Sequence, residues 1–345
     1  MVFLDYASTS PIVKFSSKQY GGFHCNPNAA YAYTERKTLM DCEERIKVAI
    51  GVKSGHVLYF RCATEAIEWL YRATIKRAGY IWWRRSLYEH DACQFGCEAK
   101  ANLVTDAIDF YIHQWVNHIT GEIFDLKTIC SQLPETCKLI VDATAGFGKA
   151  KLPSGLDNIA DALFMSGHKI GCPELSFMWV GDNICKWLGA AKDIRNQWGL
   201  HHGSLSVASV MALTDAVEWA CENGDRVDGH SVRLYVQMNN LLDEACIEHH
   251  DVIERQAYTA SINAIRLNGI NADALQQFLA TRGVYVGVGG SACSAAHDYR
   301  VLRAYGLTDG EASEVIRVSF GDETTKEDID KLVSVIKEYK ERFVV

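Results

Sequence analysis

The chain has 345 residues, of which 48% are hydrophobic and 23% are charged, with 26 Gly and only 5 Pro. This composition is typical of a globular protein and excludes collagen-like and low-complexity disordered chains. The formal net charge of −8 argues against strong direct nucleic-acid binding through a basic face. No apolar stretch approaches the roughly 20 residues that a membrane-spanning helix needs, so we expect no membrane partner.

Twelve cysteines are spread along the chain. The opening segment, MVFLDYASTSPIV, lacks the basic start and the apolar run of a secretory signal, so we expect a cytoplasmic protein with reduced thiols. No two cysteines form a CxxC pair, which argues against a structural zinc site. We therefore expect no metal and treat most of the cysteines as small buried hydrophobic residues.

The first two-thirds of the chain alternate short apolar runs with longer helical patterns. His56–Phe60 predicts a strand, and residues 63–76 predict the amphipathic helix that follows it. Several runs are apolar on both faces, as in a parallel sheet covered by helices, which predicts a wound α/β domain. Further strands are predicted at residues 79–83, 107–112, 138–142, 161–165 and 175–180.

After about residue 203 the pattern changes to long helices and scattered short strands, which predicts an α+β domain. Two long helices are predicted at residues 205–221 and 232–249, so we place the domain change near residue 225. Thr324 and Glu327 form a capping box that opens a last helix over residues 326–342. The short strands are predicted at residues 264–267, 284–288 and 315–320.

Two polar residues lie at or just after the carboxyl end of a predicted buried strand, where open α/β sheets bind their ligands. Lys169, in the segment MSGHK, could form a Schiff base with an aldehyde cofactor or could be an ordinary surface lysine. Asp142 ends the strand in KLIVDATAGFG. Its carboxylate could pair with a pyridinium nitrogen, or it could cap the next helix.

A loop of small residues, GGSACSA, follows the predicted strand at residues 284–288. Small neighbours leave Cys293 exposed enough to meet a substrate, although most of the other cysteines are expected to serve packing. The adjacent His201 and His202 would need a third ligand to hold a metal. His90 could simply be an exposed residue at the start of a helix.

Together these segments resemble the cysteine desulfurases of the NifS/IscS type, and the match runs in order along essentially the whole chain. The family pattern is met by eight segments: LDYASTSP at 4–11, NP at 26–27, CATE at 62–65, EH at 89–90, VDA at 141–143, SGHK at 166–169, GSACS at 290–294, and RVSFG at 317–321 followed by TT at 324–325.

The resemblance implies a fold-type I, class V enzyme that uses pyridoxal 5'-phosphate (PLP). It implies an α/β large domain, residues 13–225, with a mainly parallel seven-stranded sheet that binds PLP. A smaller α+β domain, residues 1–12 and 226–345, would carry the catalytic cysteine loop. The implied reaction converts L-cysteine to L-alanine and leaves a persulfide for a sulfur-acceptor protein. A homodimer is implied as well.

The resemblance also implies roles for the residues that contact the cofactor ring and the reacting atoms. Lys169 would hold PLP covalently and later move the proton. Asp142 would pair with the pyridine nitrogen, and His90 would stack on the ring. Cys293 would attack the substrate sulfur.

The phosphate of PLP would be held at a helix N-terminus, which suits an anion. The resemblance assigns this role to Ala63 and Thr64, together with Ser166 and His168. Ser204, where the family has threonine, would reach the phosphate of the partner subunit. Arg317 would bind the substrate carboxylate through its guanidinium group.

Three positions depart from the family pattern. Ala145 replaces a glutamine that bonds the phenolic oxygen of the cofactor. His118 replaces an asparagine that contacts cofactor and substrate, so we expect it in the substrate site. His201 replaces an arginine and could weaken a contact between subunits. The chain after Cys293 is also shorter than in the IscS type, which suggests a closely docked acceptor or an activator.

Two other functions stay open at this point. The altered ring contacts also fit another class V enzyme, such as a selenocysteine lyase or an aminotransferase-like protein. A degenerate scaffold could bind a sulfur-transfer partner without turnover. Iron–sulfur assembly, tRNA thiolation and DNA phosphorothioation all use enzymes of this type, and the unusual pocket favours an accessory pathway over a housekeeping one.

Overall fold

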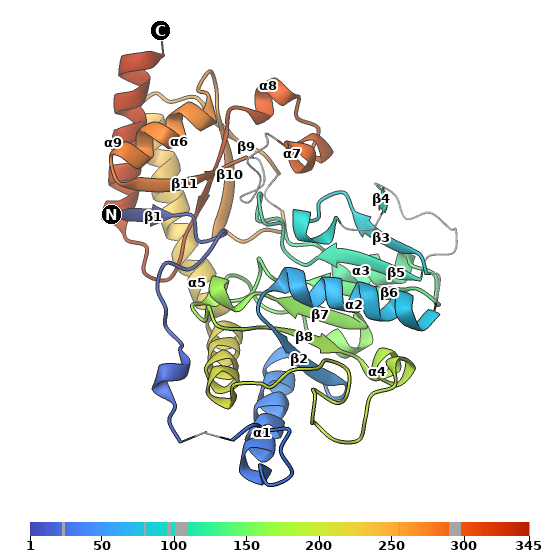
Figure 1. Cartoon of the computed structure of the whole chain (residues 1–345). Helices are drawn as coiled ribbons and strands as arrows, with labels where there is room; N and C mark the ends of the chain where they lie inside the picture. Colours follow the sequence, from blue (N-terminus) through green and yellow to red (C-terminus); the bar gives the residue numbers. More distant parts are fainter. Residues whose placement is uncertain are drawn as a thin grey trace. The chain divides into compact units, whose positions relative to one another are not determined.

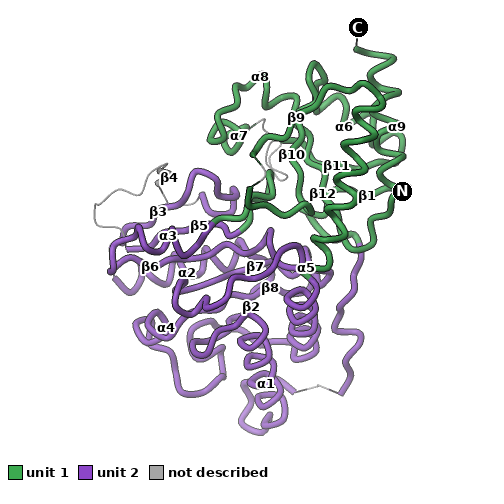
Figure 2. The backbone as a smooth tube through the Cα atoms, turned by 180° about the vertical axis from the view of Figure 1, so that it is seen from behind, with its two compact units in different colours: residues 1–11, 116–124, 224–345 green, residues 12–115, 125–223 purple. Residues whose placement is uncertain are grey.

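The computed structural model describes residues 1–22, 25–78, 81–94, 98–100, 109–254, 256–289 and 298–344. The chain divides into two compact units (Figure 2): unit 1 comprises residues 1–11, 116–124 and 224–345, and unit 2 comprises residues 12–115 and 125–223. These divisions lie within two residues of the boundaries expected after residues 12 and 225. The segment 116–124, which belongs to unit 1, was not anticipated.

Unit 2 contains a seven-stranded sheet in the order β2-β8-β7-β6-β5-β3-β4 (Figure 1). Neighbouring strands from β7 through β4 are parallel, whereas β8 is antiparallel to both β7 and β2. The mainly parallel sheet expected from the sequence is therefore confirmed. Its strands are β2 (His56–Phe60), β3 (Trp83–Ser86), β4 (Glu98–Lys100), β5 (Phe110–Gln114), β6 (Lys138–Asp142), β7 (Ala162–Met165) and β8 (Ser176–Val180).

Two strands of this sheet extend further toward their carboxyl ends than predicted. β3 continues through Arg84 and Arg85, and β5 continues through His113 and Gln114, all of them buried. The prediction followed apolar runs, and these strands become polar where they end. The first parts of both predictions, residues 79–80 and 107–108, lie outside the described residues.

Helices pack their apolar faces against this sheet. Ile67 and Leu70 of α2 belong to one cluster with Ile140 and Phe164 of the central strands, and all four side chains are fully buried. Such burial contributes about 1.5–3 kcal/mol for each large side chain. The helices are α1 (Tyr33–Ile50), α2 (Ala63–Ala78), α3 (Leu126–Gln132), α4 (Asp182–Leu188) and the first part of α5 (Val207–Glu244), with 3-10 turns η1 (Ser17–Gln19), η2 (Asp91–Cys93), η3 (Leu156–Asn158) and η4 (Gly167–Ile170).

Unit 1 contains a five-stranded sheet in the order β1-β11-β12-β10-β9. β1 is parallel to β11 through the pair Val2 and Val284, which explains why the first residues of the chain belong to this unit. Buried apolar side chains from the sheet and from three helices, the second half of α5 together with α6 and α9, form its core. The elements are β1 (Val2–Leu4), β9 (His249–Asp251), β10 (Ile262–Leu267), β11 (Val284–Val288), β12 (Val315–Ser319), α6 (Ala272–Thr281), α7 (Arg300–Ala304), α8 (Asp309–Ala312) and α9 (Lys326–Phe343).

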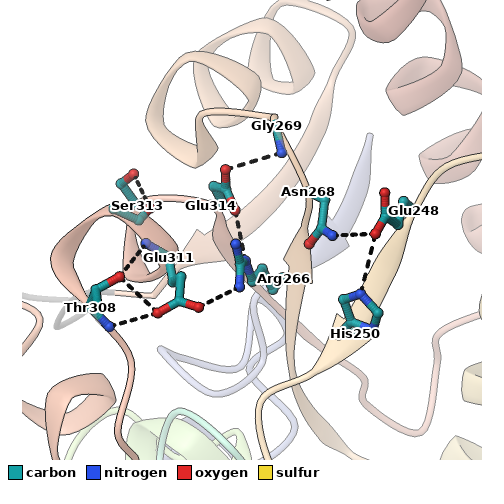
Figure 3. A network of polar contacts seen from close by, with 10 residues as sticks. Glu248, His250, Arg266, Asn268, Gly269, Thr308, Glu311, Ser313 and Glu314 are labelled. Atoms are coloured by element: carbon teal, nitrogen blue, oxygen red, sulfur yellow. Dashed lines mark hydrogen bonds and ion pairs between the residues drawn. The ribbon is translucent and has the colours of Figure 1, made fainter.

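A polar network fixes α8 to β10 within unit 1 (Figure 3). The Arg266 guanidinium donates from Nε to Glu314 at 2.7 Å and from Nη1 to Glu311 at 2.8 Å. Glu311 also completes a capping box with Thr308 at the start of α8. Arg266 therefore joins β10 both to α8, through Glu311, and to the residues that follow α8, through Glu314.

The last helix begins at Lys326 as predicted, but its capping box lies one residue further along the chain. The Thr325 hydroxyl accepts from the Asp328 N–H, and the Asp328 carboxylate accepts from the Thr325 N–H. Thr324 is occupied instead as the acceptor for the Gly321 N–H. The predicted box of Thr324 and Glu327 is thus wrong by one position.

The prediction of two helices after residue 203 is wrong, because α5 runs without interruption over Val207–Glu244. Buried residues continue at helical spacing through the expected break, as at Ala220 and Val227. Gly229, which lies between the two predicted helices, is accommodated inside the single helix. Among the described residues, no helix combines the length and apolar character needed to cross a membrane.

Replacing Gly229 with alanine tests the continuity of α5. A Cβ at Gly229 would meet no atom within 4 Å. We expect Gly229→Ala to raise the free energy of unfolding by about 0.5–1 kcal/mol, because alanine loses less backbone entropy in a helix interior. Chemical denaturation would measure the change. Gly51→Ala is the control and should destabilise, because Gly51 caps α1 at φ 73°; a destabilised Gly229→Ala would contradict the continuous helix.

Candidate active site

The carboxyl ends of five strands of the unit 2 sheet meet at one edge. The strand register pairs Gln114 with Asp142 and Asp142 with Phe164. On the other side of β7, β8 pairs with Met165 and with Phe60 close to its own start. The chain segments after β2, β3, β5, β6 and β7 therefore leave the sheet at the same edge, which is where open α/β sheets bind ligands.

Asp142 is the last residue of β6 and is only 6% exposed. Its Oδ1 accepts from the Thr144 N–H at 2.8 Å. Burial raises the pKa of this carboxyl, while the bond from Thr144 and the positive charge of Lys169 oppose the rise. A buried carboxylate of this kind is stabilised by a cationic partner.

His90 lies in a segment that packs close to Asp142. Ligand atoms of Glu89, Cys93 and Asp142, all buried, lie within 4.8 Å of one another, close enough to share a metal ion. Glu89 accepts from the Gln114 N–H, which joins this segment to β5. His90 Nδ1 accepts from the Ala92 N–H at 3.1 Å, so a neutral ring carries its proton on Nε2. The structure thus brings His90 and Asp142 to the same edge.

Lys169 lies in the 3-10 turn Gly167–Ile170, directly after β7. Its backbone N–H donates to the Ser166 carbonyl at 3.2 Å, and Ser166 itself is buried. A Cβ on Gly167 would come within 2.0 Å of the Leu175 carbonyl oxygen, so only glycine fits there. The turn therefore places Lys169 beside the end of β6, where its charge acts on Asp142.

His168 is neutral at pH 7. Burial and then the charges of Lys169 and Lys149 lower its pKa to about 4. A neutral imidazole can donate one hydrogen bond to an anion without adding a charge.

The start of α2 offers a second set of donors at this edge. α2 begins at Ala63, separated by two residues from the end of β2, and Thr64 is exposed in its first turn. The Glu65 carboxylate accepts from the Arg61 N–H at 2.8 Å and orders the approach to the helix. A helix N-terminus of this kind suits a phosphate group.

The residues of unit 2 fit PLP. The cofactor needs an amine for its aldehyde, an acid for its ring nitrogen and an anion site for its phosphate. Lys169, buried Asp142 and the start of α2 supply these three at one sheet edge. Ser204 is exposed in the segment that precedes α5, and its predicted reach to a partner subunit stays a prediction.

Arg317 and His118 are brought together in unit 1. Arg317 is 1% exposed, and its Nη1 donates to the His118 carbonyl at 3.0 Å. Its Nη2 donates to Asp5 Oδ1 and to Ser8 Oγ, both at 2.7 Å. A Cβ on Gly287 would lie 2.9 Å from Arg317 Nε, so the neighbouring strand must carry glycine there.

The Nε of Arg317 is buried and has no hydrogen-bond partner in the described part of the chain. Such a group suits a ligand acceptor, and a carboxylate is the acceptor that guanidinium geometry favours. Asp5 and Ser8 were not identified as site residues from the sequence. Both residues lie in the LDYASTSP segment, which matches the family pattern, but the match assigned no role to any residue of that segment.

Two further positions named from the sequence are Cys293 and Ala145. Cys293, with the rest of residues 290–297, lies outside the described residues. Ala145, which stands where the family has glutamine, is 4% exposed in the turns that follow β6, and the loss of that glutamine's bond to the cofactor stays a prediction.

The comparisons with known proteins agree with this arrangement. The family model for aminotransferase class-V matches residues 89–332, more than half of the chain. A putative cysteine desulfurase NifS of Halalkalibacterium halodurans is 23% identical, with 99% of both chains covered. A cysteine desulfurase IscS of Mannheimia succiniciproducens is 27% identical over 97% of this chain and 92% of its own. A solved NifS-like protein superposes with a TM-score of 0.82 at 20% identity, covering 99% of each chain.

Two histidines of unit 2 should make stability depend on pH. Burial lowers the pKa of His113 to about 4, as burial and nearby charge do for His168. The unfolded chain then binds more protons than the folded one between about pH 4 and pH 6.5. The free energy of unfolding therefore rises with pH across this window, and above about pH 6.5 the two histidines no longer change it.

We expect His113→Gln to reduce the slope of unfolding free energy against pH by up to about 1.4 kcal/mol per pH unit within that window. Urea denaturation of the cofactor-free protein at several pH values would measure it. His168→Gln should act in the same direction, and the double variant should combine both. An unchanged slope in each single variant would show that both imidazoles are charged in the folded state.

Proposed function

The chain belongs to the aminotransferase class-V family, and from that premise we propose that it is a PLP-dependent cysteine desulfurase. It converts L-cysteine to L-alanine and leaves a persulfide on Cys293. The single observation that supports this best is the buried Asp142 beside Lys169 at one sheet edge. Relatives named cysteine desulfurase over nearly the whole chain support the choice of reaction.

When bound, PLP supplies an electron sink for the negative charge that develops at the substrate Cα. Asp142 would pair with the pyridine nitrogen and keep it protonated, and that positive charge would offset the burial of the carboxylate. Lys169 would hold the cofactor through its amine and move the proton to and from the substrate Cα. His90 would stack on the ring.

The start of α2 binds the phosphate through Ala63 and Thr64, and Ser166 and His168 support it from the segment after β7. The neutral His168 contributes a donor without placing a second cation beside Lys169. Ser204, exposed before α5, reaches the phosphate in the partner subunit, so the active form is a homodimer.

Arg317 binds the substrate carboxylate. Its Nη groups are held by Asp5, Ser8 and the His118 carbonyl, while its buried Nε has no partner among the described residues and can donate to a ligand. The fixed guanidinium therefore needs no reorganisation when the carboxylate arrives. His118 lies beside it and completes the substrate site.

Cys293 receives the sulfur. A thiol with a pKa of about 8.5 is mostly protonated at pH 7, so it must lose its proton before it attacks. The thiolate forms a bond to the substrate sulfur, and the substrate carbon–sulfur bond breaks with its electron pair passing to carbon. Protonation of that carbon gives alanine, and the persulfide passes to an acceptor protein.

The nucleophile and the lysine can be tested on the purified protein loaded with PLP. With L-cysteine and a reductant, wild type should release alanine and sulfide in equal amounts, and its visible cofactor band should change on adding cysteine. Cys293→Ala should lose sulfide release by roughly 1,000-fold or more while keeping the band. Lys169→Ala should lose both the normal band and turnover.

Cys130→Ala is the matched thiol control, since Cys130 is a half-buried residue of α3. It should behave as wild type. Full sulfide release by Cys293→Ala would refute the nucleophile, and a band that ignores cysteine would refute cysteine as the substrate.

Arg317 can be tested by a substrate that lacks the carboxylate. We expect Arg317→Gln to lower kcat/KM for cysteine about 30-fold or more, because a buried charged partner is lost. Turnover of cysteamine, which has no carboxylate, should change little. Arg266→Gln, which removes a paired arginine of β10 in the same unit, is the control. An equal loss for cysteine and cysteamine would argue against a carboxylate contact.

A further inference from the structure

Unit 2 contains a left-handed turn made mostly of residues other than glycine. Asn196, Gln197 and Trp198 have φ angles of 49°, 51° and 61°, and Gly199 follows at 69°. Three consecutive side-chain-bearing residues in this conformation are strained, and they persist only where surrounding contacts hold them. The segment 196–201, which we name the brace, leads directly to the exposed Ser204.

Gln197 holds the brace to the outer edge of the sheet. β2 is the end strand of its sheet, so one side of its backbone is not paired with a strand. The Gln197 amide oxygen accepts from the Tyr59 N–H at 2.7 Å, and its amide nitrogen donates to the Tyr59 carbonyl at 3.3 Å. Gln197 is 4% exposed, so one buried side chain replaces a neighbouring strand at this point.

Trp198 fixes the same turn to α1. Its indole N–H donates to Glu43 Oε2 at 2.8 Å, and its ring stacks on His56 with centroids 4.0 Å apart. The other oxygen of Glu43 contacts His56 Nδ1 at 3.0 Å. One buried carboxylate therefore holds both partners of the stack.

The end of the brace packs on an aromatic cluster formed by Phe60, at the end of β2, and Trp69 of α2, whose ring centroids are 5.6 Å apart. The His201 ring lies 4.8 Å from the Phe60 ring, on the last residue of β2, and 6.2 Å from the Trp69 ring, on α2. The Trp69 indole N–H donates to the Leu200 carbonyl at 3.3 Å. Ala63, the first residue of α2, lies between Phe60 and Trp69 in the chain.

We propose that Gln197 and His201 are positioning residues for the cofactor phosphate: the strained brace holds the start of α2 and the segment leading to Ser204 in one fixed geometry. This inference rests on the proposed PLP-dependent function. It assigns a role to His201, which replaces an arginine of the family pattern. The His201 ring packs on aromatic residues of its own chain.

Burial supports this role, because it lowers the pKa of His201, with the charge of His202 acting in the same direction and that of Glu65 opposing it. A neutral ring packs on Phe60 and Trp69 without the desolvation cost of a cation. The contact is therefore one of shape, and another aromatic ring should replace it.

The test compares two ligands that differ only in the phosphate, PLP and pyridoxal, bound by the full-length cofactor-free protein and followed by visible absorbance. We expect His201→Ala and Gln197→Ala each to raise the Kd for PLP about tenfold, as for loss of one well-placed contact. The Kd for pyridoxal should not change. His201→Phe should restore PLP binding.

Trp69→Phe is a milder variant for the case that an alanine variant fails to fold, since it removes the bond to the Leu200 carbonyl and trims the indole while keeping an aromatic ring beside Phe60 and His201. It should weaken PLP but not pyridoxal binding. His250→Ala, at an exposed histidine of unit 1, is the matched control.

The outcomes separate the inference from the proposed function. Equal weakening of both ligands, or no change in either, would overturn the role of the brace in phosphate binding. Failure of wild type to bind PLP at all would overturn the proposed function, and the inference would fall with it.

Discussion

A carboxylate buried at the end of an apolar strand is costly unless a positive group faces it. Asp142 creates this constraint in unit 2, and groups from the surrounding segments stabilise its carboxylate. Thr144 donates one hydrogen bond, and the glycine turn after β7 brings the charge of Lys169 near. Because parallel strands end at one edge, the same geometry brings His90 and the start of α2 there as well. The fold thus places a buried carboxylate, a lysine amine and a helix N-terminus at one sheet edge, which are the groups that the proposed cofactor would need.

In unit 1 the buried charge is positive and belongs to Arg317. Arg317 is buried in the middle of a sheet, where an unpaired guanidinium would be strongly destabilising. β1 pairs with β11 and delivers Asp5 and Ser8 to it, while segment 116–124 delivers the His118 carbonyl. The first residues of the chain therefore hold Arg317, the proposed carboxylate-binding residue, at a fixed place and leave its Nε without a partner among the described residues.

The apolar centres of the strands could be predicted from sequence, and β2, β6 and β11 have the expected bounds. Two strands were predicted too short because they become polar where they end, as at Arg85 and Gln114. The site lies at that same polar edge. The three-residue strands β1, β4 and β9 were not predicted, since so short a segment carries little pattern of its own. The left-handed turn at Trp198 could not be predicted, since it contradicts local preference and depends on contacts with distant residues such as Glu43. Motif order located the candidate site; the partners of Arg317 required the fold.

The departures from the family pattern become understandable once the contacting atoms are known. At His118 the atom that bonds Arg317 is the backbone carbonyl, so this contact does not depend on the side chain. At His201 the ring packs within its own chain, and the arrangement needs an aromatic face and not a positive charge. The Arg317 contact can therefore be kept with another residue at position 118, whereas the packing on Phe60 is kept at position 201 only by another ring.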